Sequence, residues 1–215
     1  MSPLLHIVRR DLTLAFGQGG AWLPLVFFLL VATLYPFAVG PDAAVMARTG
    51  GGVLWMAALL AALLPIDRLV MPDAEAGVLD QYAVRGLADE AVAAAKIVAH
   101  WLSFGPPLMI AVTPAAALLR LDGTIVARIE IGLAIGTPGL AALALATASL
   151  TAGLRGAGAL AGLLMLPLAI PLLIFGAGTL APDGLGAIKL LAATSLLLVA
   201  GAPFAAGAAL RALRD

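Results

Sequence analysis

The chain has 215 residues, of which 63% are hydrophobic and only 11% are charged, and its mean hydropathy is +1.10. So little polar surface cannot cover a water-soluble globule, and the composition therefore predicts an integral membrane protein. The chain contains no cysteine, which excludes disulfides, thiolate-ligated iron–sulfur clusters and the C-x-x-C-H attachment site for haem.

Six runs free of charged residues divide the chain, at 21–41, 49–66, 97–119, 131–154, 156–182 and 190–210. Each run approaches or exceeds the roughly 20 residues with which an α-helix crosses the hydrocarbon core of a bilayer. Strands of a membrane β-barrel would instead alternate in hydrophobicity over about ten residues. We therefore predict an all-α membrane protein with six transmembrane helices that form a single transmembrane domain over 1–215.

Residues 1–20 precede the first run and have an amphipathic pattern. His6, Arg9 and Arg10 lie on one helical arc and apolar residues on the opposite one, although Asp11 interrupts the apolar side. This pattern favours an interfacial helix on an anionic membrane surface. A basic N-terminus that acts only as a topology signal is the alternative.

The long polar segment of the chain lies between the second and third runs, at 66–96. Pro72 and two acidic residues introduce a predicted helix from Asp73 to Arg85, and Gly86 is the candidate C-cap. Val78, Leu79 and Tyr82 would share a face that rests on the protein or membrane surface. Asp73, Asp80 and Gln81 would form an acidic face available to a partner. A solvated loop with ordinary caps is the alternative, and a second helix is predicted to start at Asp89 and continue into the third run.

The later spans carry several potential interruptions. Pro106, Pro107 and Pro114 are predicted to kink or break the third span, and 119–128 to form a polar turn before the fourth. Basic residues divide eight to four between the two membrane sides that six spans create, which places both termini and the 66–96 segment in the cytoplasm. The larger group contains Arg9, Arg10, Arg68, Arg85, Lys96, Arg155, Arg211 and Arg214, and the smaller one Arg48, Arg120, Arg128 and Lys189.

Several segments resemble those of one family in order along nearly the whole chain. They are FFLLVATLYPFAVGP at 27–41, AGVLDQ at 76–81 leading to AKIVAHW at 95–101, IGTPG at 135–139, and LPLAIPLLIFG at 166–176. These segments are similar to those of the CcmB family, haem exporter protein B of c-type cytochrome maturation. The chain departs from the family pattern at Ala76-Gly77, where the family tends to have Asp-Gly, and at Leu87-Ala88-Asp89, where it tends to have Leu-Pro-Leu.

The resemblance implies an ABC-2-type permease of the bacterial inner membrane, which has no nucleotide site and is not itself an enzyme. It implies an ATPase partner, CcmA, neighbouring subunits CcmC and CcmD, an indirect link to the haem chaperone CcmE, and two copies per complex. The 66–96 segment would contain the coupling helix, with Asp73, Glu75, Leu79, Asp80 and Gln81 at the ATPase. Membrane lipid is the other expected partner, and no binding of nucleic acid is expected.

ATP hydrolysis in the partner would drive haem transfer or release of the haem-loaded chaperone, and export of another small molecule or lipid is the alternative. No G-x-x-x-x-G-K-[ST] loop occurs in the sequence, so energy must come from another subunit. No intrinsic cofactor or metal site is expected, and haem enters as a substrate candidate.

His100 is the candidate haem ligand, an imidazole beside Trp101 near a membrane boundary, although a lone histidine there is more often a packing residue. Lys96 lies one helical turn away on the same face, where snorkelling to the membrane surface is its ordinary role. An ion-coupled carrier would need a charged residue at mid-membrane, and an intramembrane enzyme a catalytic pair. Neither pattern is present in the predicted spans.

Overall fold

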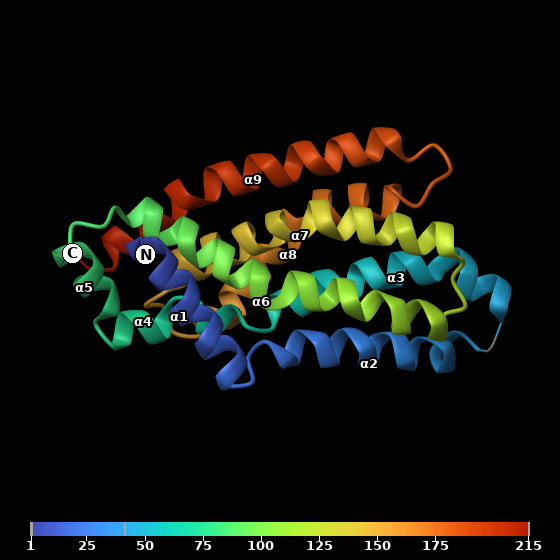
Figure 1. Ribbon diagram of the computed structural model, residues 1–215, viewed down its shortest axis with the longest axis horizontal. Helices are drawn as coiled ribbons and strands as arrows, with labels where there is room; N and C mark the ends of the chain where they lie inside the picture. The colour runs from blue at the N-terminus through green and yellow to red at the C-terminus, as the bar shows by residue number, and fades with distance from the viewer. Residues whose placement is uncertain (1, 41, 215) are drawn as a thin grey trace.

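The computed structural model describes residues 2–40 and 42–214, in which every regular element is a helix (Figure 1). Pro41, the last residue of the first predicted run, lies outside the described residues. Six helical segments of the described chain are long and apolar enough to span a membrane. The elements are α1 (Pro3–Gly17), α2 (Trp22–Val39), α3 (Ala43–Leu63), the 3-10 turn η1 (Ile66–Arg68), α4 (Met71–Glu75), α5 (Val78–Val84), α6 (Asp89–Leu118), α7 (Gly123–Thr151), α8 (Ala157–Gly178) and α9 (Leu185–Ala212). The predicted all-α fold with six spans is confirmed.

The long helices run roughly parallel or antiparallel along one axis, and α7 lies at the centre in contact with α3, α6, α8 and α9 (Figure 1). Figure 1 shows both ends of the chain at the same end of the bundle as α4 and α5, and the α2–α3, α6–α7 and α8–α9 connections at the opposite end. We call the end that holds the chain termini, α4 and α5 the polar end. The topology agrees with six crossings of a membrane.

The centre of the bundle is packed around Trp55 of α3, which is 1% exposed. A Cβ atom added to Gly132 or Gly136 of α7, or to Gly176 of α8, would stand 2.7 to 2.8 Å from the indole ring. Small residues let membrane helices approach closely, and here three glycines form a cradle for one large side chain. Gly136 belongs to the IGTPG segment, whose helix continues through without interruption.

Two helices begin earlier than predicted, because an aspartate caps each of them. The α3 helix begins at Ala43, because Asp42 accepts hydrogen bonds from the backbone N–H groups of Ala44 and Val45. Asp122 caps α7 in the same way, so most of the predicted 119–128 turn is helical. The prolines of α6 do not break the helix, which is continuous from Asp89 to Leu118.

The prediction of one helix from Asp73 to Arg85 is wrong. Gly77 adopts a left-handed conformation with φ of +66°, which ends α4 and starts α5 in a new direction. Gly86, with φ of +72°, closes α5, and the backbone N–H of Leu87 donates to the carbonyl oxygen of Tyr82 as in a Schellman cap. The prediction that Gly86 ends this helix, directly after the C-cap Arg85, and the predicted helix start at Asp89 are confirmed.

Candidate functional site

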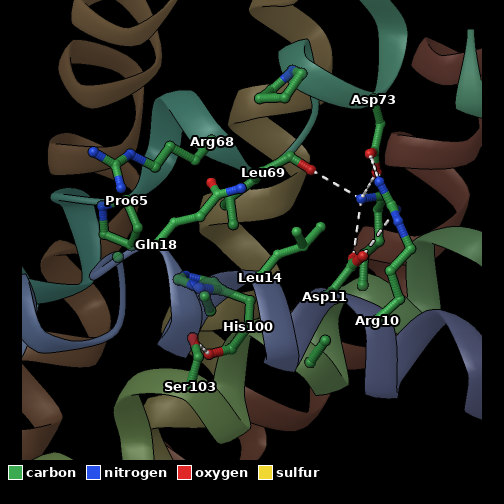
Figure 2. A pocket seen from close by; sticks show the side chains of 15 residues that line it. Arg10, Asp11, Leu14, Gln18, Pro65, Arg68, Leu69, Asp73, His100 and Ser103 are labelled. Carbon is green, nitrogen blue, oxygen red and sulfur yellow. Dashed lines mark hydrogen bonds and ion pairs between the residues drawn. The ribbon is translucent and has the colours of Figure 1, made fainter. Parts of the chain in front are cut away.

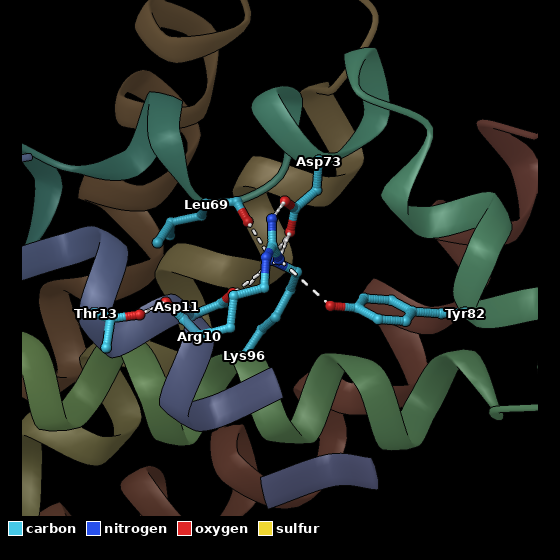
Figure 3. Close-up of polar contacts among 7 residues, drawn as sticks. All are labelled: Arg10, Asp11, Thr13, Leu69, Asp73, Tyr82 and Lys96. Atoms are coloured by element: carbon cyan, nitrogen blue, oxygen red, sulfur yellow. Dashed lines mark hydrogen bonds and ion pairs between the residues drawn. The ribbon is translucent and has the colours of Figure 1, made fainter. Parts of the chain in front are cut away.

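Four charged side chains from α1, α4 and α6 meet at the polar end (Figure 3). Lys96 of α6 donates to Asp11 of α1 at 3.1 Å, to the carbonyl oxygen of Leu69 at 3.2 Å, and to Asp73 of α4. Arg10 of α1 forms ion pairs with Asp11 and Asp73. We call these four residues, Arg10, Asp11, Asp73 and Lys96, the charge quartet. It balances two positive charges with two negative ones and ties α4 to both α1 and α6.

Lys96 and Asp73 of the charge quartet are well shielded from solvent, since their side chains are only 5% and 9% exposed. The hydrogen bond to Asp73 raises the pKa of Arg10 above its ordinary value, so this guanidinium remains charged at physiological pH. Lys96 therefore does not snorkel to the membrane surface, because its ammonium group is fully engaged inside the protein. A buried ion cluster of this kind is costly to disrupt, since removing one partner leaves an opposite charge uncompensated.

The α5 helix rests on α1 and α6 through a small apolar cluster. Tyr82 and Leu87 pack against the buried residues Ile7, Val92 and Ala95. The Tyr82 hydroxyl also accepts a hydrogen bond of 3.3 Å from Arg10, which joins this cluster to the charge quartet. The inward face predicted for α5 is confirmed at Leu79, which is 3% exposed.

A second ion cluster joins the end of α9 to the start of α6. Asp89, 8% exposed, accepts from Arg211 at 3.2 Å and from both terminal nitrogens of Arg214 at 2.6 and 2.9 Å. Arg211 also pairs with Glu90. The two helices approach so closely that a Cβ on Gly207 would lie 2.9 Å from the backbone nitrogen of Glu90. Thus α4 is anchored to α1, and α6, which follows α5 in the chain, is anchored to α9.

A cavity of about 520 Å³ lies beside the charge quartet (Figure 2). His100 lines it, 4% exposed, with its ring 4.8 Å from the ring of Phe104. The Nε2 atom of His100 has no hydrogen-bond partner among the described residues. No group of three or more histidine, cysteine or acidic side chains in the described part of the chain is arranged to hold a metal ion.

Comparison with known proteins identifies the family. The sequence profile of the CcmB protein family matches residues 2–213. The chain belongs to the CcmB family. It is 42% identical to heme exporter protein B of Bradyrhizobium diazoefficiens, with 98% of each chain covered, and 45% identical to that of Paracoccus denitrificans, with 95% of this chain and 97% of the relative covered. It is 41% identical to the Haemophilus influenzae protein of the same name, with 98% of each covered.

The CcmB family resemblance drawn from the sequence is therefore confirmed over nearly the whole chain. The structure separates the five residues expected at the ATPase into two groups. Glu75, Asp80 and Gln81 are exposed, whereas Asp73 and Leu79 are buried. The turn at Gly77 explains the difference for Asp73, because it removes this residue from the face formed by Asp80 and Gln81.

Sequence reasoning missed how this CcmB family member holds its polar segment in place. Arg10 was assigned to an arc facing the membrane surface, but it turns inward to Asp73, which lies 63 residues away in sequence. One signal was available, since Asp11 interrupts an otherwise apolar arc. A carboxylate in such a position requires a cation, and Lys96 is the lysine at the neighbouring end of a span.

Proposed function

We propose that this chain is the membrane permease subunit of a haem exporter that acts in c-type cytochrome maturation, with energy supplied by ATP hydrolysis in a separate subunit. The observation that carries this proposal is the full-length match to proteins named heme exporter protein B, together with six spanning helices. It also favours haem over another small molecule or lipid as the exported substrate. Within such a transporter the permease is not itself an enzyme.

The polar end is proposed to face the cytoplasm of a bacterial cell, with the six helices in the inner membrane as one ABC-2-type permease domain and α1 as its interfacial helix. The excess of basic residues at this end supports that orientation. The proposed partners are the ATPase CcmA, the subunits CcmC and CcmD, and indirectly the chaperone CcmE, with two permease copies in the complex. The family membership supports these assignments.

We propose that α4 and α5 together form the coupling element, and that its ATPase contact is made by Glu75, Asp80 and Gln81. These side chains are exposed, and the neighbouring Val84 is 88% exposed, which gives α5 an apolar contact point beside its polar ones. Asp73 and Leu79 hold the element on the bundle instead. A displacement of α5 by the ATPase would pass through Tyr82 and the charge quartet to α1 and α6.

Charge reversal of Asp80 tests this coupling surface. We expect Asp80→Arg to weaken co-purification with the ATPase subunit roughly tenfold, since it reverses an exposed charge at the centre of the proposed contact. ATPase stimulation in the purified complex should fall with it. The matched control is Asp183→Arg, an exposed aspartate in the α8–α9 turn at the opposite end of the bundle. Equal binding by wild type and Asp80→Arg would contradict the proposed contact.

Substitution of His100 tests whether this chain contacts haem directly. Its ring faces the cavity beside the charge quartet, and its Nε2 atom is without a partner in residues 2–40 and 42–214. Haem added to the purified chain and to His100→Phe would give the same absorbance spectrum if the imidazole is a packing residue. If the wild-type chain shifts the absorbance bands of haem and His100→Phe does not, His100 is an axial ligand.

A further inference from the structure

The cavity beside the charge quartet combines an exposed mouth with a polar interior. It lies between α1, η1 and α6, and its exposed lining residues include Leu14, Gln18 and Arg68 (Figure 2). Its buried polar residues are His100 and Ser103, together with Asp73 and Lys96 of the charge quartet. Its volume of about 520 Å³ is within the range of cavities that bind small molecules in proteins.

The charges that line this cavity do not cancel. Three cations, Arg10, Arg68 and Lys96, face two carboxylates, Asp11 and Asp73. Both carboxylates are engaged by Arg10 and Lys96 within the charge quartet. Arg68 takes part in none of the ion pairs found in the described chain. One positive charge at the mouth of the cavity is therefore available to an anion.

The position of Arg68 directs that charge toward the loop between α1 and α2. A Cβ added to Gly20 would stand 3.3 Å from the Arg68 Nη1 atom, so the guanidinium lies against this loop. Deeper in the cavity, the ring of His100 carries a nitrogen that no protein group satisfies among the described residues. Because buried polar atoms are nearly always hydrogen-bonded, a ligand with oxygen atoms suits this interior.

Exposed apolar side chains precede and follow the loop between α1 and α2, against which Arg68 lies. Leu14 is 40% exposed, Phe16 42% and Trp22 55%, and the Phe16 and Trp22 rings meet edge to face with centroids 6.3 Å apart. Tryptophan is enriched at the level of lipid headgroups, where one part of the ring is in hydrocarbon and another in a polar layer. A ligand held at Arg68 would thus have its apolar part beside exposed hydrocarbon side chains of α1 and α2.

We propose that this cavity is a binding site for an anionic phospholipid. The lipid phosphate pairs with Arg68, the polar glycerol region enters toward Gln18 and His100, and the acyl chains lie along the outer surface of α1 and α2. The lipid would lie beside the charge quartet that holds α4, so its retention stabilises the same end of the protein. The site is separate from the ATPase contact proposed on α5.

Lipid retention by the purified full-length chain tests this proposal. We expect native mass spectrometry in mild detergent to show phosphatidylglycerol bound in preference to phosphatidylcholine. Arg68→Gln should weaken phosphatidylglycerol binding roughly fivefold or more, which corresponds to the loss of one basic residue at an anionic lipid surface. The control is Arg85→Gln, an exposed arginine at the end of α5 that does not line the cavity. Its binding should match that of the wild type.

Two further arms distinguish the sources of the anion. Water-soluble glycerol phosphate should not displace the lipid, and displacement at similar concentrations would assign the site to a free phosphate and overturn the proposal. Haemin that displaces the lipid from wild type but not from His100→Phe would assign the cavity to haem instead. Equal weakening by Arg68→Gln and Arg85→Gln would show a general surface attraction and would also overturn it. Equal melting temperatures of the variants establish that folding is intact in each comparison.

Discussion

Lys96→Met is expected to destabilise the protein by roughly 3–5 kcal/mol, the usual cost of removing one partner from a buried ion pair. The side chain is 5% exposed and donates to Asp11, Asp73 and the carbonyl oxygen of Leu69. Without it, two carboxylates share one arginine, Arg10, which is itself 34% exposed. Thermal unfolding of the detergent-solubilised protein measures the loss, and the membrane level of the variant should fall with it.

The sequence offers a matched control for this substitution. Lys189 is the other lysine of the chain, and it is exposed on α9 with no ion pair among the described residues. Lys189→Met should therefore leave the melting temperature nearly unchanged. Adding Asp73→Asn to Lys96→Met should recover part of the lost stability, since it removes the carboxylate that was left uncompensated. A Lys96→Met variant as stable as the wild type would show that the charge quartet does not hold the polar end together.

Gly176→Ala is expected to destabilise the centre of the bundle by roughly 1–3 kcal/mol, the usual cost of overpacking a well-filled core. The added Cβ would stand 2.7 Å from three atoms of the Trp55 ring, and Trp55 is enclosed by α7 glycines on another side. The ring cannot retreat without displacing a helix. A lower melting temperature would be the measured result.

Gly162→Ala provides the control in the same helix. Gly162 also lies in α8, but no atom outside its local helix lies within 4 Å of an added Cβ. Since alanine has a higher helix propensity than glycine, this variant should be as stable as the wild type or slightly more stable. Trp55→Phe should partly rescue Gly176→Ala by shortening the ring. If Gly162→Ala and Gly176→Ala behave alike, the cradle does not constrain the packing of α3 against α8.

The six spans were predictable because membrane insertion depends on the composition of about 20 consecutive residues, which a single sequence records directly. Helix starts were less predictable, since Asp42 and Asp122 act as caps through local hydrogen bonds that extend helices into polar sequence. The turn at Gly77 was also missed, because a glycine within a helical pattern is equally compatible with a continuous helix and with a break.

The arrangement of the polar end was only partly predictable for a different reason. Exposed Asp80 and Gln81 follow from local periodicity, but the burial of Asp73 depends on Arg10 and Lys96, which are 63 and 23 residues away. Residues that distant are brought together only by the packing of α1 and α6. The unpaired charge of Arg68 could not be predicted for the same reason. It is recognised only once the ion pairs of the neighbouring cations are known.

The proposed coupling requires that the polar end faces the cytoplasm and meets the ATPase through α5. The absence of native cysteine makes site-specific crosslinking the most direct test. A single cysteine at Asp80, carrying a short photoreactive group, should crosslink the ATPase subunit in membranes, whereas one at Asp183 at the opposite end should not. A crosslink from position 183 with none from position 80 would contradict both the orientation and the coupling role of α5.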